Sequence, residues 1–287
     1  MLFRSAPATS AWPEFDQGRA LPRAIRNVLD NQLLLLVPPG TLLLGDESGE
    51  GEAAERPGGG DRGPLSVEIT RPFYVGRIEV TAGRYERFVQ AAGRAAPAYW
   101  GGSSCPAELR ELPVICVSWE DARAYCAWAG LRLLSEAEWE YCAKSPREGA
   151  SAGPWPWGKA RPNTRLANFD PLPPLRLQNR DWRCWLSAAE AHAEGKSPWG
   201  ILNLGGNVAE WCRDWYLEEW YSVLANREGL PIADPEGPHF GLGRVVRGGS
   251  WCSPEGRLRS SARDMAEPGS RYTFLGFRCA RDASTVR

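Results

Sequence analysis

The sequence RGGSW at residues 247–251 and the sequence LGFR at residues 275–278 bracket a segment of very different character, CSPEGRLRSSARDMAEPGSRYTF at residues 252–274. The two brackets are typical of a folded framework, in which Gly permits tight turns and large side chains provide anchors. The segment between them mixes charged, small and aromatic residues. We therefore expect it to form a surface that the framework presents.

The composition of the 287-residue chain indicates a loop-rich fold. It contains 14 Trp, 24 Pro and 31 Gly, which suits a compact fold with large aromatic anchors better than a helical bundle or a doubly wound sheet. The net charge of −1 and the isoelectric point near 6.2 provide no basic field for nucleic acid. We expect no nucleic-acid partner.

The N-terminal residues contain no apolar core long enough for a secretory signal, and the apolar run at residues 33–38 is too short to span a bilayer. This pattern predicts a soluble, cytoplasmic protein with no membrane partner. Eight cysteines are present, and without an export signal we expect reduced, mostly buried thiols. The absence of a CxxC pair disfavours a cysteine zinc site.

The periodicity predicts short strands, few helices and long loops, which together indicate an α+β fold in one domain. Strands are expected at residues 33–37, 41–45 and 66–80, the first two around a Pro-Pro-Gly hairpin or tight turn. Helices are expected at residues 20–30 and after Thr81, Ser118 and Ser135, the last with Glu138 at capping-box spacing. The sequence predicts a mobile loop at residues 47–63. It predicts an irregular region at residues 145–200, which a bound metal could order.

Several motifs occur in an order and spacing that resemble the formylglycine-generating-enzyme-like, or sulfatase-modifying-factor, domains, over residues 33–282. They are LLLLVPPGTLLLG, RPFYVGRIEVTAGRYERFV, PVICVSWEDARAYCAWAGLRLLSEAEWEYCAK, WGILNLGGNVAEWCRDWY, RVVRGGSW and LGFRCARD. The resemblance implies a C-type-lectin-like fold with a small mixed sheet, two flanking helices and long ordered loops. We expect an N-terminal extension at residues 1–30 and one such domain at residues 31–287.

Two enzyme branches of this family use metals whose ligands this chain does not supply. Formylglycine generators resemble it but have a GGS-x-x-C-x-x-x-x-C pair of copper-binding cysteines, where this chain has Ser253 and Leu258. Neither offers the soft thiolate that Cu(I) requires, and Cys252 lies one position away. A second branch uses a three-histidine iron site, whereas only His192 and His239 are present. We expect no copper and no iron.

A third branch that the chain resembles comprises the variable proteins of diversity-generating retroelements, which display a diversified C-terminal ligand-binding surface on the same fold. Their fixed GGSW, L-R-S-like segment, Arg, Pro and GFR match Trp251, residues 258–260, Arg263, Pro268 and residues 276–278. The changeable positions would lie within a variable segment at about 247–281. They are Cys252, Ser253, Gly256, Arg257, Asp264, Met265, Ala266, Glu267, Ser270, Tyr272, Thr273 and Phe274.

The chemistry of this segment favours binding, because aromatic, thioether and guanidinium groups are enriched at binding hot spots. The alternative is that Tyr272 and Phe274 are core residues of a last strand.

The segment GILNLGGNVAEW resembles the calcium-binding segment of formylglycine-generating enzymes. The resemblance implies Asn203, Gly206, Val208 and Glu210 as ligands of a structural Ca²⁺, which favours carboxylate, amide and carbonyl oxygens. The alternative is that the Asn side chains bond the turn and that Glu210 pairs with an arginine. A second calcium site beginning at Asn168, with Asp170 or Asp181 as partner, is left open.

The sequence therefore predicts a protein that is not an enzyme and that binds a ligand through its variable segment, with formylglycine generation or a related oxidation as the alternative. The ligand is expected to be a protein or other macromolecule, and the chain a monomer.

Overall fold

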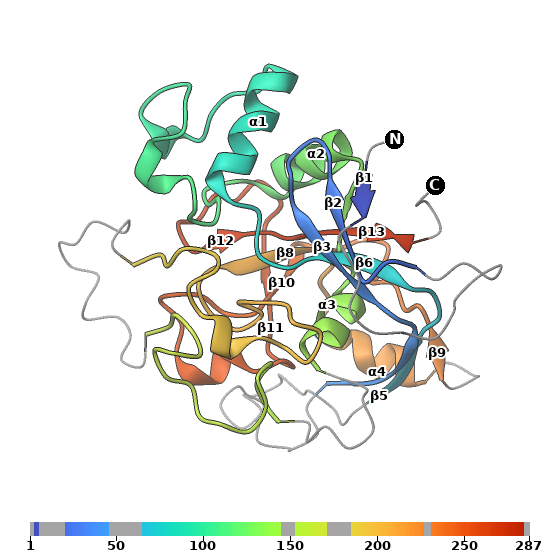
Figure 1. Cartoon of the computed structure of the whole chain (residues 1–287). Coiled ribbons are helices and arrows are strands. Elements are labelled where there is room, and N and C mark those ends of the chain that lie inside the picture. Colours follow the sequence, from blue (N-terminus) through green and yellow to red (C-terminus); the bar gives the residue numbers. More distant parts are fainter. Residues whose placement is uncertain are drawn as a thin grey trace.

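The structure, a computed structural model, describes residues 3–5, 21–45, 65–144, 153–170, 185–226 and 231–283. Within these residues, three β-sheets and a few helices are joined by long connections (Figure 1). The expected α+β class is confirmed. The loop predicted at residues 47–63 lies outside the described residues.

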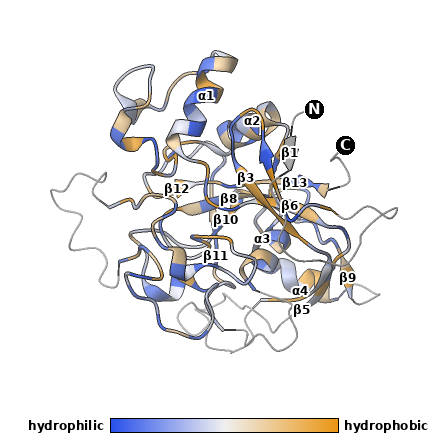
Figure 2. Cartoon of the chain, viewed as in Figure 1, coloured by the Kyte–Doolittle hydropathy of each residue, from blue (hydrophilic) through white to orange (hydrophobic). Residues whose placement is uncertain are grey.

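The largest sheet separates two apolar cores. Its strand order is β1 (Phe3–Ser5), β2 (Ala24–Asn27), β3 (Leu33–Val37), β6 (Phe73–Gly76), β13 (Cys279–Asp282) and β7 (Arg132–Leu133). Neighbouring residues of β6 enter different cores, since Tyr74 packs with one cluster and Val75 with the other. Strands buried on both faces read as continuous apolar runs, as the colouring of β3 and β6 in Figure 2 illustrates.

The N-terminal prediction of a helix at residues 20–30 is wrong, because residues 24–27 are strand β2 and pair with β3. A tight turn follows, in which the backbone of Leu29 donates to Asn27 Oδ1 at 3.1 Å and Asn31 has a positive φ of 58°. Short polar side chains bond their own backbone in such turns in competition with a helix. The extension predicted for residues 1–30 is thus too long, since residues 24–27 belong to the main sheet.

The expected strands at residues 33–37 and 41–45 form, but they do not pair with each other. A second, three-stranded sheet contains β4 (Gly40–Leu44), β5 (Leu65–Ile69) and β9 (Ile232–Ala233). The Pro-Pro-Gly segment is therefore a corner between two sheets and not a hairpin. The chain expected as one strand from residue 66 onward is divided between β5 and β6 for the same reason.

Three described α-helices begin where the capping residues predict, and a short fourth helix was not predicted. The helices are α1 (Ala82–Ala92), α2 (Trp119–Ala129), α3 (Glu136–Ala143) and the short α4 (Trp220–Ala225), with 3-10 turns at Ala98–Trp100, Ala107–Leu109, Ala193–Gly195 and Glu255–Leu258. Thr81 caps α1, and Ser118 and Ser135 form capping boxes at α2 and α3. Among the described residues, no helix combines the length and apolar character needed to cross a bilayer.

The third sheet carries both of the sequence brackets. Its order is β11 (Arg263–Ala266), β10 (Arg244–Arg247), β8 (Ala209–Trp215) and β12 (Leu275–Gly276). Strand β12 runs parallel to β8, and the other pairs are antiparallel, so the sheet is mixed. The segment between the brackets begins at β10, contributes the edge strand β11 and returns into β12 beside β8.

Amide side chains connect the long loops that follow α3. Asn168 Nδ2 donates to the carbonyl of Trp185 at 2.6 Å and to Asn207 Oδ1 at 3.1 Å. Asn207 Oδ1 also accepts from the backbone of Ser187 at 3.0 Å. The segments at Asn168 and at residues 185–187 are thus held to each other and to the turn before β8, in the region where we expected a bound metal as a possible organiser.

Candidate ligand-binding site

A cavity of about 370 Å³ lies at the end of the bracketed segment, between the third sheet, the turn after β10 and the chain that enters β12. Eight of the twelve residues expected to bind ligand line it together. They are Cys252, Ser253, Arg257, Asp264, Met265, Ala266, Tyr272 and Phe274. The sequence segment therefore folds back on itself to form one concave surface.

The remaining expected residues lie outside this lining. Gly256 and Glu267 are exposed, and Ser270 and Thr273 are half-buried. Ala266, although it lines the cavity, is only 8% exposed and forms part of its wall. It is buried because it belongs to β11 and faces the core, which the sequence segment alone did not indicate.

The aromatic end of the segment forms one wall of the cavity. The rings of Tyr272 and Phe274 stack with centroids 4.9 Å apart and an angle of 5° between their planes. Tyr272 is 43% exposed and Phe274 is half-buried, so neither is a fully buried core residue. Phe274 does pack at the margin of the core beside Trp251, so the core alternative holds in part for that ring.

The turn after β10 is rigid framework. Gly248 and Gly249 have φ of 94° and 64°, which residues with a Cβ rarely adopt. The backbone of Trp251 donates to the carbonyl of Asn207 at 2.8 Å, and its ring stacks on Trp185 at 5.9 Å. The turn is thereby fixed from two sides.

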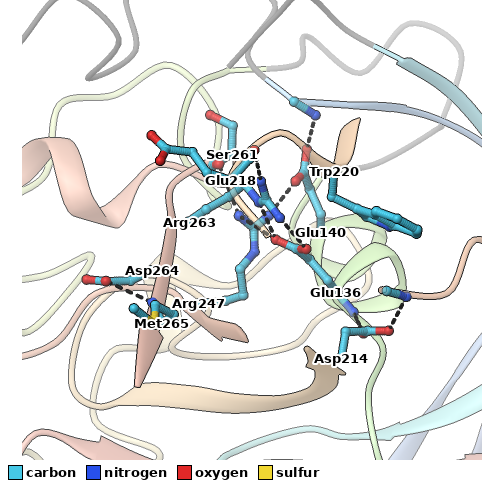
Figure 3. Close-up of polar contacts among 12 residues, drawn as sticks. Glu136, Glu140, Asp214, Glu218, Trp220, Arg247, Ser261, Arg263, Asp264 and Met265 are labelled. Atoms are coloured by element: carbon cyan, nitrogen blue, oxygen red, sulfur yellow. Dashed lines mark hydrogen bonds and ion pairs between the residues drawn. The ribbon is translucent and has the colours of Figure 1, made fainter. Parts of the chain in front are cut away.

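Two arginines of the cavity lining, Arg247 and Arg263, belong to a layer of buried ion pairs, whose contacts Figure 3 draws. Arg247 from β10 pairs with Glu140 of α3, and Arg263 of β11 binds both oxygens of Glu136 at 2.7 and 2.9 Å. Arg247 and Glu140 are wholly buried. The Arg263–Glu136 contact is bidentate, and together the two ion pairs hold two strands and a helix in one arrangement.

Burial and nearby partners act in opposite directions on the pKa values of the carboxyl groups in and beside this layer. Burial alone would raise the pKa of Glu136, but the charge and hydrogen bonds of Arg263 outweigh it, so the pKa is lowered. The nearby carboxyl of Asp214 accepts from the backbones of Glu136 and Gly237 at 2.5 and 2.7 Å. Burial dominates there and raises its pKa to about 6.

Sequence reasoning placed Arg263 in the framework but missed Glu136 and Glu140. Their spacing of four residues after the Ser135 cap places both on one face of α3, so a paired acidic face was visible in the sequence. The partners could not be assigned, because Arg247 and Arg263 lie more than 100 residues away along the chain.

The positions that correspond to copper-binding cysteines do not assemble a metal site. Ser253 Oγ lies 3.1 Å from Ser250 Oγ, which is 3.3 Å from Cys252 Sγ, and Leu258 is buried. Burial raises the pKa of the Cys252 thiol, so the neutral thiol predominates at neutral pH. Cys184 lies outside the described residues.

Of the four residues expected to hold calcium, Glu210 has both carboxylate oxygens engaged by other side chains. Arg278 donates to both oxygens of Glu210 at 2.5 and 2.6 Å, and Trp139 Nε1 donates to one at 2.8 Å. The amide nitrogen of Asn203 donates to Glu79 at 2.8 Å, and Gly206 and Val208 lie in the same buried turn. A guanidinium beside the carboxylate repels a cation, so this arrangement does not fit a calcium ion.

The other metal predictions concern His192, His239 and the loop at Asn168. His192 Nε2 lies 2.9 Å from Ser187 Oγ, and His239 is exposed. No group of three or more His, Cys, Asp or Glu residues that could hold a metal occurs in the part of the chain that the structure describes. Of the two partners considered for Asn168, Asp181 lies outside that part.

Comparisons with known proteins agree with this architecture. A family model described as "Sulfatase-modifying factor enzyme 1-like domain" matches residues 21–283. PvdO from Pseudomonas aeruginosa has a similar structure, with a TM-score of 0.70 and 24% identity, covering 92% of this chain and 100% of that one. Treponema denticola variable protein 1 also has a similar structure, with a TM-score of 0.59 and 21% identity, covering 88% of this chain and 95% of that one. These two likenesses concern the fold, and the expected C-type-lectin-like fold is confirmed.

The sequence relatives correct one prediction. The formylglycine-generating enzyme of Streptomyces coelicolor is 31% identical, with 97% of this chain and 95% of that protein aligned. The expectation that the chain is not an enzyme conflicts with this finding and is wrong, because it relied on two missing cysteines and gave too little weight to similarity over the whole length. With a family model covering nearly all of its residues, the chain belongs to the sulfatase-modifying factor enzyme 1-like family.

Proposed function

We propose that this family member binds a polypeptide or other macromolecular ligand in the cavity between Cys252 and Phe274, in the manner of a variable protein. The observation that carries the proposal is the convergence of eight expected residues on one cavity. Its volume of about 370 Å³ is within the range of ordinary ligand sites and fits one large side chain of a longer ligand. The predicted monomeric state is part of the proposal.

The lining supports recognition by shape and apolar contact. Met265 and Tyr272 are 45% and 43% exposed. A Tyr ring provides a large contact area at a low cost in side-chain entropy, and the flexible Met side chain adapts its shape to a partner. Arg263 is neutralised by Glu136 below, and Arg257 lies 3.5 Å from Asp264 at the cavity. The charges at the cavity are thus paired, which favours an apolar anchor from the ligand.

A displayed library of random 12-residue peptides would test this proposal. Peptides selected on the unmodified chain should bind the Tyr272→Ala and Met265→Ala variants about tenfold or more weakly, the usual effect of removing a hot-spot side chain. Leu43→Ala is the matched control, because Leu43 is also 43% exposed but lies outside the cavity. Selected peptides that bind the Tyr272→Ala, Met265→Ala and control proteins equally would refute the proposal.

A second candidate, oxidation of a peptide cysteine to formylglycine, is favoured by the names of the sequence relatives. Only Cys252 offers a thiol among the described cavity-lining residues. Incubation with a CxPxR peptide, copper and oxygen, followed by aldehyde detection with an aminooxy probe, tests this candidate. Aldehyde formation that disappears in Cys252→Ser would establish it, and no aldehyde above the protein-free control would count against it.

A further inference from the structure

A pair of apolar side chains beside the cavity is far more exposed than a folded protein requires. Phe240 and Leu242 are 84% and 86% exposed, roughly twice the exposure of the other large apolar side chains exposed among the described residues. Burying side chains of this size against a partner contributes about 1.5 to 3 kcal/mol each. Both lie in the loop that leads into β10.

The backbone of this loop is seated firmly, which forces the two side chains outward. A Cβ on Gly241 would lie 2.8 Å from the carbonyl of Tyr216 and 3.3 Å from the side chain of Trp215. A Cβ on Gly243 would collide with Met265, and the Gly243 carbonyl accepts from the backbone of Tyr216 at 2.8 Å. The glycines thus let the loop lie flat while Phe240 and Leu242 project from it.

The exposed pair continues directly into the cavity lining. Met265, which lies over Gly243, also lines the cavity. Leu217, 38% exposed, follows Tyr216, and its carbonyl accepts from Arg263 of β11 at 3.3 Å. We call Leu217, Phe240, Leu242 and Met265 the apolar rim.

Unpaired carboxylates border the apolar rim. Glu218, Glu219 and Glu267 are exposed, and no ion pair or side-chain hydrogen bond involves them among the described residues. Arg263 binds the backbone carbonyl of Glu218 at 3.0 Å and not its carboxylate, as Figure 3 allows the reader to follow.

The cations nearby are already engaged. Arg244 is stacked between the rings of Trp119 and Trp215 at 3.7 and 3.6 Å, and Arg257 is held near Asp264. Stacking leaves the charge of Arg244 in place. The carboxylates of Glu218, Glu219 and Glu267 outnumber it, so the described surface around the apolar rim carries surplus negative charge, which complements a basic partner.

We propose that the apolar rim binds a polypeptide segment that carries apolar side chains flanked by Lys or Arg, with one side chain anchored in the cavity. This inference rests on the cavity being a ligand site, as proposed above. The apolar side chains would cover Phe240 and Leu242, and the basic flanks would face Glu218, Glu219 and Glu267. Steering between opposite charges makes the association sensitive to salt.

Two labelled 12-residue peptides test the inference with the full chain, both with a central Phe-Leu-Trp and one flanked by Lys, the other by Glu. Fluorescence anisotropy should show at least tenfold tighter binding of the Lys peptide at 50 mM than at 500 mM salt, and little binding of the Glu peptide. The Phe240→Ser/Leu242→Ser variant should weaken the Lys peptide about tenfold or more, whereas Leu43→Ser should not.

Charge reversal separates the two contributions. In the Glu218→Lys/Glu267→Lys variant, binding of the Lys peptide should no longer depend on salt, and the Glu peptide should bind more tightly than the Lys peptide. The exposed control Glu194→Lys should keep the salt dependence and the preference for the Lys peptide. If Tyr272→Ala weakens binding of library-selected peptides but the rim and charge variants bind the Lys peptide normally, the inference is overturned and the cavity proposal stands. Failure of the Lys peptide to bind the unmodified chain would also overturn the inference.

Discussion

The carboxyl of Asp214, buried beside the ion-pair layer, should make the protein less stable as the pH rises. Its oxygens accept hydrogen bonds from the backbones of Glu136 and Gly237 (Figure 3). These bonds favour the charged form, but burial disfavours it more, and the pKa is raised from 3.8 to about 6. The perturbation that isolates this effect is Asp214→Asn, which cannot titrate.

The sign and size of the effect follow from the two pKa values. Because the folded-state pKa lies above the unfolded value, the folded protein binds the proton more tightly. The resulting stabilisation is fully present below pH 3.8 and is lost as the pH rises through about 6. A shift of about two units corresponds to about 3 kcal/mol, of which about 2 kcal/mol is lost between pH 4 and pH 7.

Urea unfolding followed by Trp fluorescence at several pH values measures this effect. The Asn variant loses one hydrogen bond at every pH, an offset of about 1 to 3 kcal/mol, so the test is the change of the difference with pH. Relative to Asp214→Asn, the unmodified protein should lose about 2 kcal/mol of unfolding free energy between pH 4 and pH 7. A constant difference, or one that changes no more than for exposed Glu194→Gln, would refute the reasoning.

Two further predictions concern the charged interior. Arg247→Met should destabilise the protein by about 3 to 5 kcal/mol, because it leaves the buried carboxylate of Glu140 without its arginine, whereas Arg271→Met at a half-exposed pair should cost less than about 1 kcal/mol in the same urea experiment. Because Arg278 occupies both oxygens of Glu210, the one carboxylate among the expected ligands, replacing millimolar calcium by EDTA should leave the thermal midpoint unchanged. A clear fall in the midpoint would restore the calcium site that the sequence predicts.

Local signals in the sequence were enough to predict where α1, α2 and α3 begin, but not the short α4. Ser118 and Ser135 cap α2 and α3 as expected, because a capping box is formed by residues three positions apart and needs no tertiary contact. The helix expected at residues 20–30 failed for the opposite reason. Pairing of β2 with β3 and the side-chain bonds of Asn27 override a weak local preference, and neither is readable from those residues alone.

The residues that line the cavity could largely be predicted from the sequence, but the buried ion pairs below them could not. The bracketed segment was identified from its motifs, and Ser253, Asp264 and Tyr272 do meet at one cavity. The ion pairs below it could not be read from the sequence, since α3 meets β10 and β11 only in the folded chain. The exposed loop with Phe240 and Leu242 gave no signal, because isolated apolar residues beside Gly read as an ordinary turn.

The bracketed segment is held mainly through its backbone, so a substitution of an exposed side chain in it should leave its shape unchanged. Arg247 donates to the carbonyls of Ser260, Ser261 and Ala262 at 2.9, 3.0 and 2.6 Å. At the other end, the carbonyls of residues 272, 273 and 274 accept from Cys116, Trp251 and Ala209. Framework residues thus fix the segment by its backbone, which every residue type supplies. A substitution at Asp264 or Tyr272 changes what a ligand meets, while the contacts that position the segment remain.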